Sequence, residues 1–283
     1  MTAPPTRMVS LSAKQAFRQH WPLYLFEAIL LGLFMVAASG ATVFMEYPSS
    51  AGAAMFPSPF MRRAVIGVAM GLTAVILIYS PLGKRSGAHM NPAFTLSFLH
   101  LRKMQRWDGA FYITAQFIGG MAGVWVSCAL FGYVAMRSPQ VEYIVTVPGI
   151  WGNIGAWGGE FTISLVLMLA VLFLNHFQRL APYTGWFVGL LIASFVTFEA
   201  PLSGMSINPA RTFGSAVLAN LWTGWWIYDT APIAGMLLGV IISRLVARDS
   251  ELLCARLNHS PHGLHVHPCQ CVQPQAKASA PQP

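Results

Sequence analysis

Long stretches without a charged residue alternate with short charged segments along this chain. Such stretches cover residues 28–45, 64–83, 109–136, 143–159, 161–178 and 180–198. A bilayer core about 30 Å thick is crossed by about 20 apolar helical residues, so these stretches have the length of membrane spans. Runs such as LLGLFMVAA and LVLMLAVLFL do not alternate apolar and polar residues, which argues against the strands of a β-barrel.

The pattern therefore predicts an all-α membrane protein. Six spanning helices are expected at residues 22–44, 63–80, 108–132, 159–177, 182–201 and 225–247. The segment 202–222 is also poor in charge, but it contains SGMSINPARTFGSA, with a proline, an arginine and several small residues. These residues are unfavourable in a helix that faces lipid, so a different structure is expected there.

The two halves of the chain repeat one another. The tetrapeptide NPAF at Asn91 recurs as NPAR at Asn208, and YITAQFIGGMAG from Tyr112 resembles YDTAPIAGMLLG from Tyr228. Because each half has three spans, an odd number, the second half enters the bilayer in the opposite sense to the first. We therefore expect an inverted repeat with halves at about 21–132 and 158–247.

Each NPA tripeptide has the features of a helix start. Asn91 and Asn208 are good N-caps, and Pro92 and Pro209 occupy the first helical position, where a missing N–H costs nothing. The helices PAFTLSFLHL and PARTFGSAVL are too short to cross a bilayer. They are expected to be re-entrant half-helices preceded by the extended segments SGAHM and LSGMSI. Non-helical backbone at membrane depth is tolerated only inside protein or along a water-filled cavity, so a continuous polar path is implied.

The charge distribution gives the expected orientation. Charged residues make up only 9% of the chain, and the formal net charge is +8. Most of the 17 Lys and Arg residues flank the expected spans on one side, which the positive-inside rule makes cytoplasmic, together with both termini. Topology thus explains the positive charge, and no nucleic-acid partner is expected. The expected location is a plasma membrane, the inner membrane of a bacterial cell.

The motifs SGAHMNPAF and SGMSINPARTFGSAV, the six spans and a glutamate near the start of each half resemble the aquaporin or major intrinsic protein family over about residues 20–247. The resemblance implies an hourglass fold and a homotetramer in the lipid bilayer, with one pore per subunit. It also implies passive conduction of water or small neutral solutes, without protons or ions, cofactor or enzymatic activity. The expected domains are a cytoplasmic segment 1–20, a channel domain 21–247 and a cytoplasmic tail 248–283.

Expected pore residues follow from the half-helices and the resemblance. Two helix N-termini that meet place positive dipole ends at the pore centre, where they repel cations. The pore motifs are Asn91, Pro92, Ala93, Asn208, Pro209 and Ala210, and the asparagine amides are expected to donate to a passing oxygen. The loop residues Gly87, Ala88, His89, Met90, Gly204, Ser206 and Ile207 are expected on one wall, His89 fixing its loop, with an apolar wall opposite.

Three charged residues in this region have two interpretations each. Glu27 and Glu160 are either proton-relay carboxylates or, as the resemblance implies, braces that accept hydrogen bonds from the two loops. Arg211 is either a snorkelling interfacial residue or a pore-lining charge near the outer mouth. Its place in a half-helix that must face the cavity favours pore lining.

Water-selective members of the resembled family have an aromatic residue in span two and a histidine in span five, beside the arginine. Here the corresponding constriction is expected at Met70 (or Gly71), Val196, Met205 and Arg211. Without an aromatic residue or a histidine, it should be less polar and not tightly water-selective. Thr212 and the lack of a wide aromatic pair depart from the glycerol-conducting branch, and Asp229 fits neither branch. The choice between water alone and water with glycerol, ammonia or a metalloid hydroxide stays open; water with relaxed selectivity is favoured.

The tail has a different composition. Seven potential metal ligands lie close together there: Cys254, His259, His262, His265, His267, Cys269 and Cys271. Such a cluster has ligands suited to Zn²⁺ or Cu⁺, but its spacing matches no standard zinc module. A disordered tail without metal is the favoured interpretation.

Two other classes of membrane protein remain as alternatives. An ion-coupled secondary transporter is also built from inverted repeats, and it needs an acidic coupling residue, for which Glu199 and Asp229 are the unassigned candidates. A structural junction protein would show no permeability. The chain offers no nucleophile, acid–base pair or cofactor loop in an expected cavity, so an enzyme is not expected.

Overall fold

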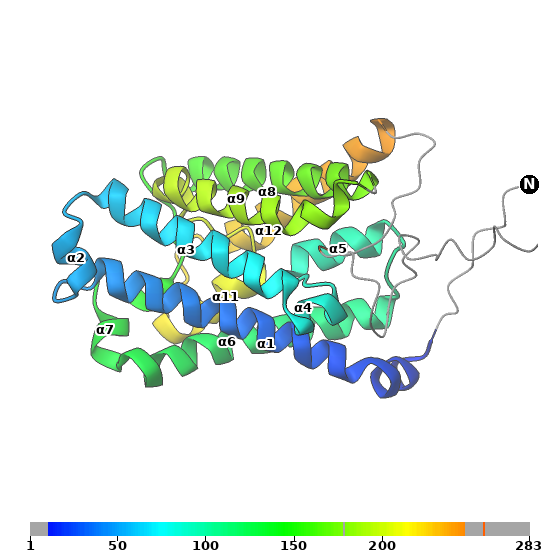
Figure 1. Cartoon of the computed structure of the whole chain (residues 1–283), viewed down its shortest axis with the longest axis horizontal. Helices are drawn as coiled ribbons and strands as arrows, with labels where there is room; N and C mark the ends of the chain where they lie inside the picture. Colours follow the sequence, from blue (N-terminus) through cyan, green and yellow to red (C-terminus); the bar gives the residue numbers. More distant parts are fainter. Residues whose placement is uncertain (1–10, 178, 247–256, 258–283) are drawn as a thin grey trace, which may run out of the picture.

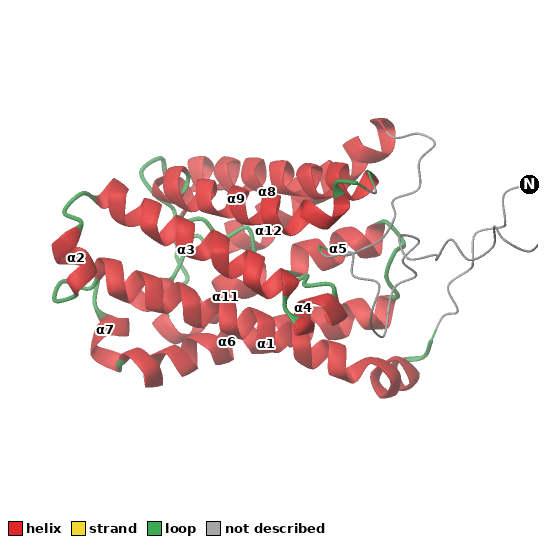
Figure 2. Ribbon diagram, in the orientation of Figure 1, coloured by secondary structure: helices red, strands yellow, loops and turns green. Residues whose placement is uncertain are grey.

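The computed structural model describes residues 11–177, 179–246 and 257 and, over these residues, consists of helices and loops without a strand (Figure 2). The helices, in chain order, are α1 Ala13–Glu46, α2 Ala51–Met55, α3 Pro59–Tyr79, α4 Pro81–Ser86, α5 Pro92–His100, α6 Arg106–Phe131, α7 Tyr133–Arg137, the 3₁₀ turn η1 Glu142–Ile144, α8 Gly152–His176, η2 Ala181–Tyr183, α9 Thr184–Phe198, α10 Ala200–Ser203, α11 Pro209–Ala219 and α12 Trp225–Val246. Six of the described helices are long and apolar enough to cross a membrane, which confirms the predicted fold class.

Some helix boundaries differ from those expected. α1 begins at Ala13, inside the segment 1–20 that was expected to precede the first span. The reason is a capping box, in which the Ser12 backbone N–H donates to the Gln15 side chain at 2.9 Å and the Ser12 hydroxyl accepts from the Gln15 N–H. α8 begins at Gly152, several residues before the expected start of the second half. α9 ends at Phe198, and Pro201 lies in the first turn of the separate helix α10.

The long helices run side by side along the molecule (Figure 1). α1 packs against α6, α8 against α12, and α3 against α9. The α1–α6 crossing is close because small residues let the two backbones touch. A Cβ at Gly119 would lie 2.2 Å from the Ala28 carbonyl oxygen, and one at Gly123 would lie 2.5 Å from that of Gly32.

The two short helices α5 and α11 lie between the long helices (Figure 1). With nine and eleven residues, they are about 14 and 17 Å long, roughly half of a bilayer core. Pro92 and Pro209 begin them, and Asn91 and Asn208 are their N-caps. α5 packs on α6 and α12, and α11 packs on α6. Each half-helix is therefore in contact with protein at membrane depth.

Candidate functional site

Two loops of unusual backbone precede the half-helices. Gly87 and Gly204 end the short helices α4 and α10 with φ angles of 93° and 81°, which glycine adopts without steric cost. In each loop, the residue directly after the glycine and the residue two positions further on also have a positive φ, although none of them is a glycine: Ala88, Met90, Met205 and Ile207. Each such residue costs on the order of 1 kcal/mol. The surrounding structure must therefore hold both loops in place.

Glu27 of α1 binds the first loop. Its Oε1 accepts a hydrogen bond from the His89 N–H at 3.1 Å, and its Oε2 accepts from the Met90 N–H at 2.6 Å. Oε2 also accepts from Nε2 of Gln116 in α6 at 2.8 Å. Glu27 is fully buried, so these donors replace the water that a carboxylate would otherwise need.

Glu160 of α8 binds the second loop in the same way. Its Oε1 accepts from the Ser206 N–H at 2.6 Å and from the Ser203 hydroxyl at 2.8 Å. Its Oε2 accepts from the Ile207 N–H at 2.6 Å. This carboxylate is also fully buried. Both carboxylates thus accept hydrogen bonds from the loop backbones, which is the arrangement that a brace requires.

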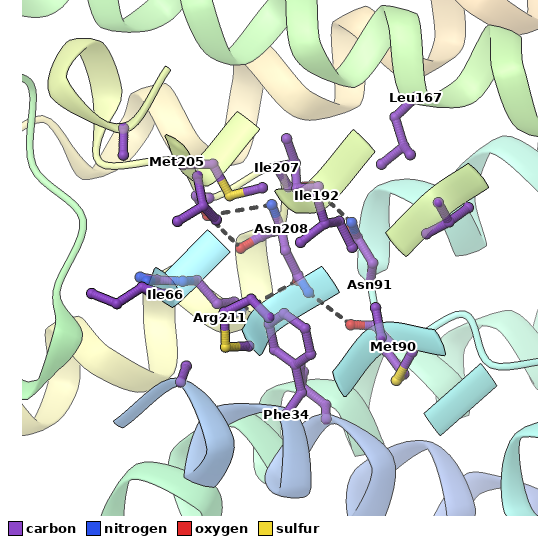
Figure 3. Close-up of a pocket in the computed structure, with 18 of the residues that line it drawn as sticks. Phe34, Ile66, Met90, Asn91, Leu167, Ile192, Met205, Ile207, Asn208 and Arg211 are labelled. Atoms are coloured by element: carbon purple, nitrogen blue, oxygen red, sulfur yellow. Dashed lines mark hydrogen bonds between the residues drawn. The ribbon is translucent and has the colours of Figure 1, made fainter. Parts of the chain in front are cut away.

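The two asparagines connect the loops to each other. Asn91 Nδ2 donates to the Ile207 carbonyl at 2.7 Å, and Asn208 Nδ2 donates to the Met90 carbonyl at 2.7 Å (Figure 3). Each Oδ1 accepts from the N–H of the alanine two residues further on, which caps its own helix. The N-termini of α5 and α11 therefore meet, and each amide has a second N–H hydrogen for a ligand.

A cavity of about 270 Å³ runs past this meeting point. Along α3 it is lined by Arg63, Ile66, Met70, Ala74 and Ile78. Their spacing of three or four residues defines one face of the helix over about 22 Å, most of the way across a bilayer core. Further apolar residues, including Phe34, Leu167 and Ile192, face the asparagines (Figure 3). The cavity thus has one apolar wall and one wall made by the two loops.

All four expected constriction residues line this one cavity: Met70, Val196, Met205 and Arg211. Gly71, the alternative position in span two, instead faces α9, where a Cβ would lie 2.4 Å from the Gly189 carbonyl oxygen. Of the expected pore residues, His89, Met90, Asn91, Gly204, Ser206, Ile207 and Asn208 also line the cavity. Gly87, Ala88, Pro92, Ala93, Pro209 and Ala210 are not among the lining residues and are buried behind it.

His89 lines the cavity, with its ring packed against α5. Its ring stacks on Phe98 with the centroids 5.0 Å apart, and Nδ1 lies 3.2 Å from the Thr95 hydroxyl. The side chain is 2% exposed. These contacts fix the ring against α5, in agreement with the expectation that His89 holds its loop in place.

The connection between α7 and α8 positions Arg211, which sequence reasoning did not anticipate. Arg211 donates from a terminal guanidinium nitrogen to the Ile144 carbonyl at 2.7 Å. Ile144 belongs to η1, where three consecutive residues have positive φ. The hydroxyl groups of Thr146 and Thr212 lie 2.7 Å apart and join the same connection to α11. No motif marks this segment in the sequence, because the partner of Arg211 is a backbone carbonyl.

The mouths of the cavity contain further residues without a sequence signal. Thr42, Glu46 and Arg63 line it at the end where α1 finishes and α3 begins. Glu46 accepts a hydrogen bond from Arg62 Nε at 2.9 Å. At the opposite end Leu257 lines the cavity; its backbone N–H donates to the Gly87 carbonyl at 3.1 Å, and it is 2% exposed.

The candidate coupling residues of an ion-coupled transporter, Glu199 and Asp229, are not among the described residues that line this cavity. Glu46 is the one acidic residue among them. The seven candidate metal ligands of the tail lie outside the described residues.

Six spans, two half-helices joined at their N-termini and a cavity through that joint define an inverted-repeat membrane channel. The family model of the major intrinsic proteins matches residues 15–243. The chain is 31% identical to the probable aquaporin NIP7-1 of Arabidopsis thaliana over 80% of this chain and 78% of that protein. It is 35% identical to aquaporin NIP2-1 of Zea mays over 70% and 66%, respectively. The aquaglyceroporin structure from Plasmodium falciparum aligns with a TM-score of 0.67 and 19% identity, covering 81% of this chain and 98% of that chain.

This chain belongs to the major intrinsic protein family, which comprises the aquaporins. It is a multi-pass membrane channel of a family that passively conducts water and small neutral solutes, and it is not an enzyme. The resemblance stated from the motifs is thereby confirmed.

Proposed function

We propose that this channel has relaxed selectivity and passes small uncharged polyols such as glycerol in addition to water. The observation that carries the proposal is the composition of the constriction. Three of its four side chains, Met70, Val196 and Met205, are apolar, and Arg211 is the one polar group. A ring with one polar side chain can replace few of the hydrogen bonds that a water molecule makes in solution. Its apolar side chains can instead contact the carbon atoms of a polyol.

The two walls of the cavity suit a solute with two kinds of surface. The hydroxyl groups of a polyol would face Arg211 and the two asparagine amides, which supply donors. Its carbon atoms would lie against the apolar wall formed by α3 and α9. The solute thus exchanges its hydration for fixed groups without tight binding, which permits fast passage.

Exclusion of cations has a separate basis. The N-termini of α5 and α11 point at the same place, and each carries about half a positive charge. Arg211 adds a full positive charge along the cavity, and at the mouth Arg62 and Arg63 outnumber the one carboxylate, Glu46, which pairs with Arg62. A cation or hydronium ion therefore meets a repulsive potential at the mouth and at the centre, whereas a neutral solute does not.

The test is stopped-flow light scattering on proteoliposomes, with a sucrose shock for water and a glycerol gradient for the solute. Wild type is expected to pass both. Val196→His should lower glycerol flux by about tenfold and leave water flux within about twofold, because a larger polar group narrows the ring and binds water. Val196→Leu adds volume without polarity and serves as the matched control. Wild-type vesicles that pass water quickly but glycerol no faster than empty vesicles would overturn the proposal.

We further propose a homotetramer in the plasma membrane with both termini in the cytoplasm. The support for the orientation is the concentration of basic residues at one end of the spans. Cross-linking in the membrane would test the tetramer, and protease access to a C-terminal tag in sealed inside-out vesicles would test the orientation. A tag that is cleaved in right-side-out vesicles instead would contradict the orientation.

A further inference from the structure

A second cavity lies outside the pore, at the end of the molecule where α5 finishes and α6 begins. Its volume is about 1100 Å³. The charged and polar residues that line it are His100, Arg102, Gln105, Arg106 and Arg244, and the apolar ones are Leu11, Leu96, Leu99, Met104, Trp107 and Leu237. These residues come from α5, the bend after it, the start of α6, and α12, together with Leu11 before α1, whose N–H donates to the Gln105 side chain at 3.1 Å. We propose that this cavity binds the phosphate headgroup of an anionic phospholipid.

The charge of the cavity points to an anion. Three arginines line it, and no described lining residue carries a carboxylate. Asp108 is the nearest acid in sequence, but it is fully buried, and its Oδ1 is engaged by the Tyr24 hydroxyl at 2.6 Å and by His20 Nδ1 at 2.9 Å. The guanidinium groups therefore line the cavity without a carboxylate among the described lining residues, and phosphate is one of the two anionic groups that the planar arginine fork binds with paired hydrogen bonds.

Part of this charge has a structural role. Arg244 donates to the His100 carbonyl at 2.9 Å, at the C-terminus of α5, where a cation is favourable. That bond uses one of five guanidinium donors, so the others stay available. Arg102 and Arg106 are exposed, and the two ion pairs within the described chain, His20–Asp108 and Arg62–Glu46, involve neither.

The apolar residues point to a lipid rather than to free phosphate. Leu96 and Leu99 of α5 and Leu237 of α12 extend the cavity from the arginines toward the membrane-spanning part of the helices. Trp107, 47% exposed, has the character of a residue at a membrane interface. A basic cavity lined also by apolar residues of a half-helix and of the spanning helix α12 suits a headgroup with acyl chains attached.

Native mass spectrometry of the full-length protein tests the proposal, with titration of phosphatidylglycerol and, separately, phosphatidylcholine. Wild type is expected to bind the anionic lipid at least about fivefold more tightly. Arg102→Gln with Arg106→Gln should weaken phosphatidylglycerol binding by about tenfold or more and leave phosphatidylcholine unchanged. Glutamine keeps the Cβ, so the positive φ of Arg102 is no more strained than before.

The matched control is Lys14→Gln with Arg18→Gln, which removes two exposed charges from α1 near the same end of the molecule. It should keep wild-type affinity. Equal loss of binding in the control, or equal affinity of wild type for the two lipids, would overturn the proposal. Inorganic phosphate at millimolar concentration serves as the third arm: displacement of the lipid by phosphate alone would show a simple anion site. Retained water flux in proteoliposomes shows that the variants are folded.

Discussion

The two pore loops of this channel have nearly the same hydrogen-bond pattern, although they enter the membrane from opposite faces. In each loop a buried glutamate accepts two consecutive backbone N–H groups, at His89 and Met90 in the first and at Ser206 and Ile207 in the second. The third donor differs: it is Gln116 of α6 in the first half and Ser203, the last residue of α10, in the second. The hydrogen bonds from backbone N–H groups to the glutamate are thus the same in both halves, whereas the side chain that supplies the third donor differs.

The residue that follows each NPA tripeptide differs more. Phe94 and Arg211 occupy corresponding positions, and both line the cavity. In the first half the position is filled by an aromatic ring that stacks near Phe98 at 6.5 Å. In the second it is filled by a guanidinium held by the Ile144 carbonyl. We propose that the symmetric parts build the pore and that the asymmetric position, Arg211, selects what passes.

The largest expected effect tests the symmetric part. Glu27→Gln and Glu160→Gln each replace a carboxylate oxygen by an NH₂ group, which then faces an N–H donor instead of accepting from it. Each should destabilise the folded protein by about 3 kcal/mol, because buried donors lose their acceptor. The measurement is the temperature at which detergent-solubilised protein stops eluting as a single species by size exclusion.

The two variants should lose similar amounts of stability, since the two networks have the same backbone donors. Thr114→Ala serves as a control, because its exposed hydroxyl bonds only to Ala110 in its own helix. A wild-type melting temperature for either glutamine variant would show that the brace is dispensable in that half.

A smaller effect is expected where the two half-helices pack differently. A Cβ at Gly214 of α11 would lie 2.5 Å from the backbone of Gly120 in α6. Gly214→Ala should therefore cost about 1–3 kcal/mol, through a forced separation of the helices. Ser97 is the corresponding residue of α5, and its hydroxyl donates within the helix to Ala93. Ser97→Ala should cost less than about 1 kcal/mol in the same thermal assay, and equal losses would contradict the difference in packing.

The symmetric features could be predicted from the sequence more completely than the asymmetric ones. The paired NPA tripeptides and the uncharged stretches determine helix starts and spans through capping and hydropathy, which are local properties, and the six spans were predicted on that basis. The start of α8 at Gly152 was missed because its first residues contain no strong cap. The contact between Arg211 and Ile144 was also missed, because a backbone carbonyl 67 residues away leaves no trace in residue types.

Arg211→Met tests the asymmetric position itself. Methionine keeps much of the length but removes the charge, so the proton leak should rise by about tenfold, the equivalent of about 1.4 kcal/mol of electrostatic barrier. The half-helix dipoles remain, which limits the increase. The leak is read from a pH-sensitive dye trapped in proteoliposomes under an imposed proton gradient. Phe94→Leu, at the corresponding position, should change the leak by less than about twofold. A comparable increase in both variants would mean that pore width, not charge, excludes protons.

The smallest expected effect concerns the end of the pore opposite Arg211. Leu257 lines the cavity there and donates its N–H to Gly87, so its side chain occupies part of that mouth. Because an apolar side chain in a pore both narrows it and disfavours water, Leu257→Ala should raise water flux by about twofold in the sucrose-shock assay. Leu245→Ala, which removes the same atoms from a side chain 66% exposed on α12, should leave flux unchanged. Equal flux in wild type and Leu257→Ala would show that this contact does not obstruct the conducting channel, and the two mouths would then differ in charge alone.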